Sequence, residues 1–241
     1  MFSVRFIQVS KRLRGKDVLK NVSFAVPQAS LACIIGENGS GKTTLLKLAA
    51  GLYLPDSGIV SCGAEAAGLS IARVVGFANA DSPGFYDRLT LHQNLLFFAA
   101  LHGLIGNSAR RRIDRLFEWF DLREADVRFQ ELSSGARQRL TLARSLLHDP
   151  LILLWDEPTR SLDPAHAAFV RDLARDELRR GQGKTIPWST HQSSELDYLA
   201  DQVLWLDRGA LKADVLRPHL IEMPEVARWM RQAARPDRVP A

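Results

Sequence analysis

The sequence predicts an α/β protein with a mainly parallel sheet, and three observations carry this prediction. The apolar run Leu31–Ile35 precedes a glycine-rich segment and leucines at helical spacing. Strand-like runs at 151–155, 186–190 and 202–206 follow later, with a helical block at 164–180 between the first two. Such strand–helix–strand alternation is typical of a parallel sheet with crossover helices.

The first part of the chain predicts an additional antiparallel β-subdomain. Segments 4–9 and 22–26 are apolar or alternating, and a polar turn at 14–16 separates them. After the buried strand and its helix, Gly51 is expected to end that helix, as glycine commonly does just past a helix C-terminus.

The middle of the chain predicts helices rather than strands. We expect an inserted α-helical subdomain at about 82–147, with Ser108 as one N-cap. An apolar stripe marks the helix that follows Ser108; it consists of Ile113, Leu116, Phe117 and Phe120. The chain as a whole, 1–241, is expected to form one domain, with a short tail at about 211–241 for which the sequence indicates no element.

Composition narrows the class of protein without naming a function. The 241 residues carry a formal net charge of +5, which suits a nucleotide, a nucleic acid or an anionic membrane surface equally well. Cys33 and Cys62 form no CxxC pair, so a structural zinc site is not expected. The N-terminus lacks the apolar core of a signal peptide, and no apolar run approaches the ~20 residues of a spanning helix.

The segment Gly36–Thr43 carries the strongest chemical signal. It matches the pattern G-x-x-x-x-G-K-[ST] and lies between a predicted strand and a predicted helix, which is the context that this phosphate-binding loop requires. Its glycines let several N–H groups turn toward an anion, and the helix N-terminus adds its dipole. We therefore predict a P-loop NTPase core. The expected nucleotide-binding residues are Gly36, Glu37, Asn38, Gly39, Ser40, Gly41, Lys42, Thr43 and Thr44.

Three polar residues follow later strands. Asp156 and Glu157 end the apolar run 151–155, and His191 ends the run 186–190. Ligands of parallel sheets bind at the carboxyl ends of the strands. We expect Thr43 and Asp156 to bind Mg²⁺, Glu157 to act as the base for the attacking water, and His191 to approach the γ-phosphate.

The segment Glu131–Ala136, Glu-Leu-Ser-Ser-Gly-Ala, permits two interpretations. Ser133 can cap the helix that follows, as serine commonly does. Alternatively, the Ser133 hydroxyl, the Gly135 N–H and the helix dipole can together bind a phosphate.

The order of these motifs resembles the ATP-binding cassette (ABC) ATPases over roughly residues 4–209. The resemblance implies that Leu132–Ala136 is the family's signature motif, which binds the γ-phosphate held by the other subunit of a head-to-tail dimer. It further implies that Ser161–Asp163 is the D-loop, that His191 is the switch histidine, and that Glu157 is the catalytic glutamate. The ligands implied are ATP and Mg²⁺, with Lys42 at the β- and γ-phosphates.

Two positions depart from the family pattern. Leu13 stands where an aromatic residue usually stacks on adenine. The glutamine that usually contacts Mg²⁺ is replaced by Ala80 or Asp81, depending on a one-residue gap, and Asp81 could bind Mg²⁺ or its water shell.

The resemblance also implies partners. They are a separate transmembrane permease and a second cassette, expected to be a copy of this chain, with no nucleic acid among them. The expected location is the cytoplasmic face of the membrane. An aromatic cluster suits the permease contact or the core; it comprises Phe85, Tyr86, Phe97 and Phe98.

Two other functions remain open at this point. One is a soluble cassette ATPase of DNA repair, chromosome maintenance or translation, although no long coiled coil, zinc module or second cassette is visible. The other is an unrelated P-loop kinase or GTPase, although the guanine-reading motif Asn-Lys-x-Asp is missing. The export-type transporter ATPase explains more of the motifs than either.

Overall fold

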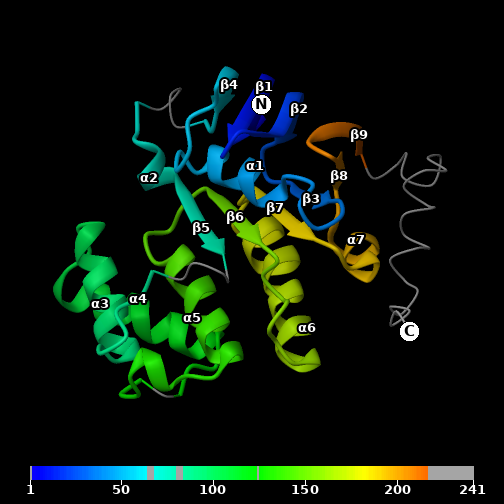
Figure 1. Ribbon diagram of the computed structural model, residues 1–241. Coiled ribbons are helices and arrows are strands. Elements are labelled where there is room, and N and C mark those ends of the chain that lie inside the picture. The colour runs from blue at the N-terminus through cyan, green and yellow to red at the C-terminus, as the bar shows by residue number, and fades with distance from the viewer. Residues whose placement is uncertain (1, 64–67, 80–83, 124, 217–241) are drawn as a thin grey trace.

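The computed structural model describes residues 2–63, 68–79, 84–123 and 125–216. Within these ranges the strands form two sheets, one with the order β2-β1-β4 and the other with the order β5-β6-β7-β3-β8-β9 (Figure 1). The predicted α/β class, with an N-terminal antiparallel sheet and a mainly parallel core sheet, is confirmed.

The antiparallel sheet comprises β1 (Phe2–Leu13), β2 (Lys16–Pro27) and β4 (Ser57–Ser61). The predicted polar turn lies between β1 and β2, where Gly15 has a φ of +79°. The alternating residues of β1 and β2 place one face of the hairpin on the core. Phe6 and Phe24 stack there with ring centroids 4.6 Å apart.

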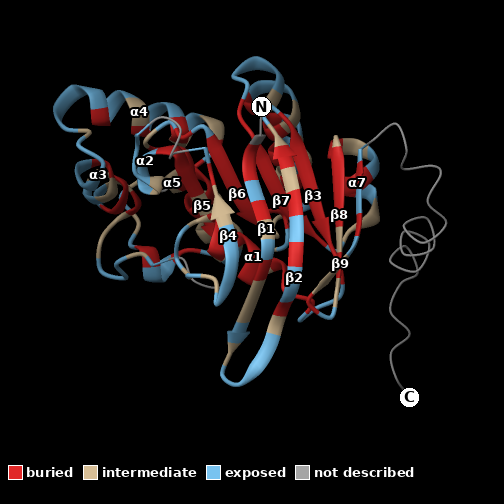
Figure 2. Cartoon of the chain, turned by 90° about the horizontal axis from the view of Figure 1, so that it is seen from above, coloured by how far each residue is buried: buried red, intermediate tan, exposed pale blue. Residues whose placement is uncertain are grey.

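The core sheet contains β5 (Val75–Asn79), β6 (Ile152–Asp156), β7 (Ile186–Thr190), β3 (Leu31–Ile35), β8 (Gln202–Asp207) and β9 (Ala210–Leu216). Each pairing between its strands is parallel except that of β8 with β9. Every residue of β3, β6 and β7 is buried, as Figure 2 shows, because both faces of the sheet are covered. The sequence indicates no element in the tail from about 211, whereas the structure has the strand β9 at its start.

Alternate residues of the core sheet enter two hydrophobic cores. Ala32 and Ile34 face the core that β1, β2 and helix α1 (Lys42–Ala49) complete. Cys33 and Ile35 face the second core. That core is completed by α5 (Ser134–Leu146), α6 (Pro164–Asp172), the π-helical segment η3 (Leu173–Gly181) and α7 (Ser193–Leu199).

Helices dominate the segment between β5 and β6. They are α3 (Leu91–Leu101), α4 (Gly106–Trp119), the short 3₁₀ turn η2 (Phe129–Glu131) and α5; the four-residue helix α2 (Ile71–Val74) lies just before β5. The apolar stripe on α4 is buried at Ile113, Leu116 and Phe120, and Phe117 packs against the same core. None of the helices in the described part of the chain is long and apolar enough to span a bilayer.

Two helix ends test the sequence predictions directly. Gly51 follows the C-cap of α1 with a φ of +70°, as expected. The prediction that Ser108 is an N-cap was wrong, because α4 begins at Gly106 and Ile105 is its N-cap. The Ser108 hydroxyl instead donates to the Ile105 carbonyl oxygen at 2.7 Å, from inside the first turn.

Candidate active site

The loop from Gly36 to Gly41 joins β3 to α1. Two of its glycines, Gly36 and Gly41, leave no room for a Cβ atom. A Cβ atom at Gly36 would lie 2.2 Å from the Leu206 carbonyl oxygen. A Cβ atom at Gly41, where φ is +111°, would lie 2.8 Å from a methyl group of Leu19. The motif therefore needs glycine at both positions for steric reasons.

Lys42 and Thr43 are the first two residues of α1, and their side chains bind different partners. The Lys42 ammonium is buried and donates to the carbonyl oxygens of Gly36 at 2.8 Å and Glu37 at 3.1 Å. Burial lowers the pKa of Lys42, while the nearby carboxylates of Glu157 and Asp156 act in the opposite direction. The Thr43 hydroxyl donates to Asp156 Oδ2 at 2.7 Å.

Asp156, at the end of β6, lies at the centre of the polar site. Its Oδ1 accepts from the Ser189 hydroxyl, and its Oδ2 accepts from Thr43 and from the Asn79 amide at 2.9 Å. Burial raises the pKa of Asp156, and the hydrogen bonds from Ser189 and Thr43 oppose that rise. The carboxylate is thus held in one orientation by donors from three other elements.

Glu157 follows Asp156 directly after the end of β6. Its backbone has a φ of +45°, and its N–H donates to the Ser189 hydroxyl oxygen at 2.9 Å. One carboxylate oxygen lies 3.4 Å from His191 Nδ1, and the other lies 3.5 Å from a guanidinium nitrogen of Arg160. Ser189 therefore connects the two adjacent acids and fixes their relative positions.

These residues surround one pocket of about 450 Å³. Its lining combines cations, carboxylates, amides and the glycines of the loop, which suits a polyanionic ligand with its counter-ion. The lining residues are Val18, Asn38, Gly39, Gly41, Lys42, Thr43, Thr44, Asn79, Asp156, Glu157 and Arg160.

The remaining predicted residues lie at the edge of the pocket or beyond it. Glu37 is exposed, Ser40 is buried below the loop, and His191 reaches the site through Glu157. Ala80 and Asp81 lie outside the described residues.

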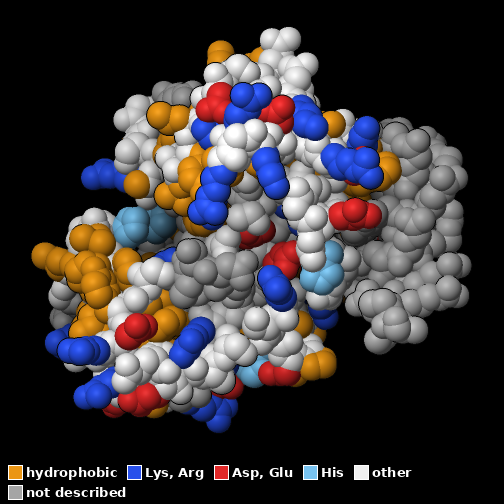
Figure 3. Space-filling view, in the orientation of Figure 1, with side chains coloured by type: hydrophobic (Ala, Val, Ile, Leu, Met, Phe, Trp, Pro, Cys, Tyr) orange, Lys and Arg blue, Asp and Glu red, His pale blue; other side chains and the backbone are white. Residues whose placement is uncertain are grey.

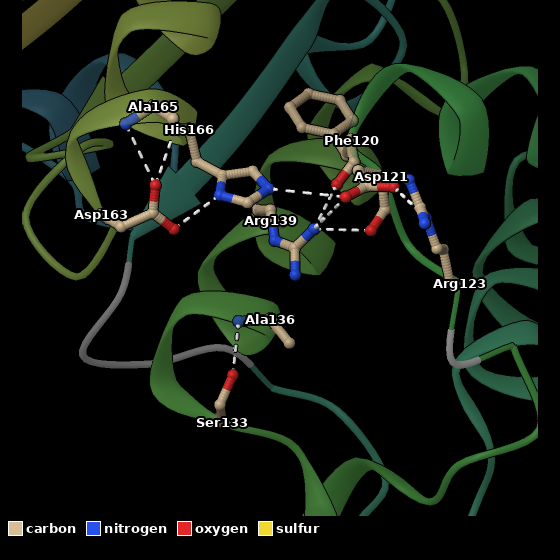
Figure 4. A network of polar contacts seen from close by, with 9 residues as sticks. All are labelled: Phe120, Asp121, Arg123, Ser133, Ala136, Arg139, Asp163, Ala165 and His166. Atoms are coloured by element: carbon tan, nitrogen blue, oxygen red, sulfur yellow. Dashed lines mark hydrogen bonds and ion pairs between the residues drawn. The ribbon is translucent and has the colours of Figure 1, made fainter.

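Ser133 and Gly135 lie at the start of α5, away from the lining of the pocket. The Ser133 hydroxyl oxygen accepts from the Ala136 N–H at 3.2 Å, so it caps the helix (Figure 4). Of the two interpretations of this segment, the helix cap is the one that the contacts within a single chain support. A phosphate contact by the same serine would have to involve another molecule.

Asn79, Ser189 and Arg160 are members of the site that the sequence motifs did not predict. Asn79 and Ser189 are the cross-strand neighbours of Asp156 on β5 and β7. For Ser189 the available signal was its position near the carboxyl end of the predicted strand 186–190.

Replacing Asn79 by alanine is expected to lower the free energy of unfolding by about 1.5–3 kcal/mol, because the buried Asp156 carboxylate loses a hydrogen bond. Urea unfolding measures this change. Asn38→Ala is the matched control, since the Asn38 side chain is exposed in the same pocket. Equal stabilities of the two variants would show that the Asn79 bond contributes nothing.

Comparisons with known proteins agree with this geometry. The family model described as ABC transporter matches residues 19–160. Nod factor export ATP-binding protein I of Burkholderia pseudomallei is 38% identical over 227 residues, covering 91% of this chain and 72% of that protein. ABC transporter ATP-binding protein NatA of Bacillus subtilis is 35% identical, covering 83% and 84%.

Solved structures show the same fold. An ATP-binding subunit of an ABC transporter superposes with a TM-score of 0.83 at 23% identity, covering 98% of this chain and 100% of that one. A dimeric bacterial ABC transporter cassette superposes with a TM-score of 0.77 at 23% identity, covering 88% and 98%. Since the family model also spans more than half of the sequence, the chain belongs to the ABC transporter family, as an ATP-binding subunit.

Proposed function

We propose that this chain hydrolyses ATP to drive a substrate outward through a separately encoded membrane permease. The observation that carries the hydrolysis is the convergence of Lys42, Thr43, Asp156 and Glu157 on one pocket at the carboxyl end of the core sheet. The relatives named for export support the direction.

Nucleotide binding would rest on the loop and on Lys42. The loop N–H groups and the N-terminus of α1 favour phosphate. The Lys42 ammonium now donates to two loop carbonyls, and the same group would turn to the β- and γ-phosphates. Val18 supplies an apolar side chain at the edge of this pocket, while Leu13 offers no ring for the adenine.

The donor set suits Mg²⁺. Thr43 and Asp156 place a hydroxyl and a carboxylate oxygen 2.7 Å apart, and hard oxygen ligands of this kind are those that Mg²⁺ prefers. When bound, Mg²⁺ would neutralise phosphate charge. Asp81 stays a predicted third contributor.

Glu157 would take the proton from the water that attacks the γ-phosphate. A positioned general base contributes typically about 10²–10⁴-fold. Ser189 holds the Glu157 backbone, and His191 and Arg160 flank its carboxylate within 3.5 Å, which limits the positions that the base can adopt.

A second copy of the chain would complete the site. Ser133 and Gly135 lie outside the pocket of their own chain, so they would meet the γ-phosphate in the pocket of the partner copy. The dimeric cassette among the structural neighbours supports such a pair.

The permease contact is proposed for an exposed apolar patch on and beside α3, here called the α3 patch: Tyr86, Phe97, Leu101 and Ile105. Their exposed fractions run from 38% at Phe97 to 71% at Ile105. Figure 3 shows hydrophobic side chains gathered over α3. Phe85, by contrast, stacks on Phe129 and meets Phe98 edge to face, and the Arg144 guanidinium lies over both Phe85 and Phe98. Phe85 and Phe98 therefore belong to the packing beneath the patch. A contact there would place the chain at the cytoplasmic face of the membrane.

The relatives named above are transport proteins, and the comparisons give no support to a role in DNA repair, chromosome maintenance or translation. Family membership also removes the unrelated kinase or GTPase.

Affinity capture tests the permease. Tagged Glu157→Gln protein, added to detergent-solubilised membranes, is expected to retain a multi-spanning membrane protein in stoichiometric amount, identified by mass spectrometry. The matched variant with Leu101→Glu added is expected to lose it, because a charge enters the apolar α3 patch. Capture of ribosomal or DNA-bound proteins by both variants, with no membrane protein, would contradict the proposal.

A further inference from the structure

A polar network around His166 connects α6 to the inserted helices within one chain (Figure 4). His166 lies in the first turn of α6 and is half-buried. Its Nδ1 lies 2.6 Å from Asp163 Oδ2, and its Nε2 lies 3.7 Å from Asp121 Oδ2. The imidazole therefore stands between a carboxylate at the N-cap of α6 and one at the end of α4.

Asp121 adopts a backbone conformation that glycine would adopt more easily. Its φ is +46°, in the left-handed region. The side chain nevertheless has a defined place, since its carboxylate meets Arg123 at 2.5 Å and lies 3.9 Å from Arg139. Two arginines therefore hold the Asp121 carboxylate.

Arg139 joins this network to α5. Its guanidinium donates to the carbonyl oxygens of Phe120 at 2.9 Å and Asp121 at 2.5 Å. Arg139 thus joins α5, the helix that Ser133 caps, to the end of α4.

Two further contacts hold α5 against the segment after Glu157. The buried Gln138 amide donates to the Pro158 carbonyl oxygen at 2.9 Å. A Cβ atom on Gly135 would lie 3.2 Å from the Ser161 carbonyl oxygen, so the two backbones are close. The first turn of α5 and the 161–163 segment thus lie side by side.

Both ring nitrogens of His166 face a carboxylate, the Asp163 oxygen at 2.6 Å and the Asp121 oxygen at 3.7 Å. The charged groups facing the network are Asp163 on α6, Asp121 and Arg123 beside α4, and Arg139 on α5. Hydrogen bonds from His166 hold the pKa of Asp163 below its usual value.

We propose that His166 is a positioning residue for ATP hydrolysis that holds Asp163 toward the end of α4 and so fixes the 161–163 segment, beside the first turn of α5, as part of the surface for the partner copy. The inference rests on the proposed function, since it assumes that this surface closes the site of a second chain. His166 does not line the nucleotide pocket. Its loss should therefore lower kcat and leave the KM for ATP nearly unchanged.

The test compares wild type with His166→Ala and His166→Gln in steady-state ATP hydrolysis at neutral pH. We expect His166→Ala to lower kcat about tenfold, with KM within about twofold, because a misplaced group remote from the reacting atoms acts on turnover. His166→Gln keeps a side-chain amide that can donate to Asp163, so it should restore part of kcat.

A kcat of wild-type size in His166→Ala would overturn the inference, as would a raised KM at constant kcat. An inactive wild type would contradict the proposed function instead. Hydrogen exchange then decides the inference without ATP. The amides of 163–166 and of the first turn of α5 should exchange faster in His166→Ala than in wild type, and equal exchange would overturn it.

Discussion

Replacing Glu157 by glutamine should lower the turnover number for ATP by about 10²–10⁴-fold, because glutamine keeps the shape of the side chain but cannot accept a proton from water. The N–H of residue 157 would still bind Ser189, so the loop should keep its conformation. Nucleotide binding should survive, since Lys42 and the loop glycines are untouched. Phosphate release and retention of labelled ATP on the isolated protein measure the two effects separately.

The control for Glu157→Gln is Glu118→Gln, which neutralises an exposed carboxylate on α4 at no cost to the pocket. It should hydrolyse ATP at the wild-type rate. Near-normal turnover in Glu157→Gln itself would remove Glu157 from its proposed role and leave the pocket without an assigned base.

Ser133→Arg should abolish ATP-dependent dimerisation. The bulky side chain would stand where the proposed surface meets the γ-phosphate of the other copy, and the helix would lose its cap at a cost of about 1 kcal/mol. Light scattering in the Glu157→Gln background, with and without Mg-ATP, should find dimers for the parent and monomers for the double variant.

Two substitutions at Ser133 separate the cap from the phosphate contact. Ser133→Asp keeps a strong N-cap but brings a negative charge toward phosphate, so it should fold normally and fail to dimerise. Ser133→Thr keeps both the cap and the hydroxyl, so it should dimerise. If Ser133→Arg dimerised with ATP as well as the parent does, the shared site would be wrong.

The sequence predicted two kinds of feature best: strands that are buried on both faces of the sheet, and motifs whose residues are contiguous in the chain. The strands Leu31–Ile35 and Ile186–Thr190 agree with the structure at both ends, because continuous apolar runs mark strands that are covered on both faces. The strand Ala210–Leu216 was not predicted, because it is a partly exposed edge strand that carries Lys212 and Asp214. Ser108 was misplaced because a serine inside the first turn and a serine at the cap look alike in sequence.

The candidate site shows the same division. The loop from Gly36 to Thr43 is contiguous, so its geometry follows from the motif. Asn79 and Ser189 join the site only through strand order, since β6 lies between β5 and β7 and pairs Asp156 with both. The order of the strands along the chain does not give their order in the sheet. The contacts of Asn79 and Ser189 with Asp156 therefore could not be predicted from the sequence.

The rate of phosphate release from Mg-ATP, measured per chain as the concentration of the purified protein is varied, tests the central claim most directly. If two copies form the site, the rate per chain should rise with concentration, level off once dimers predominate, and fall to background throughout in Glu157→Gln. A rate per chain that stays constant down to the lowest concentrations, or that survives the loss of Glu157, would contradict the account.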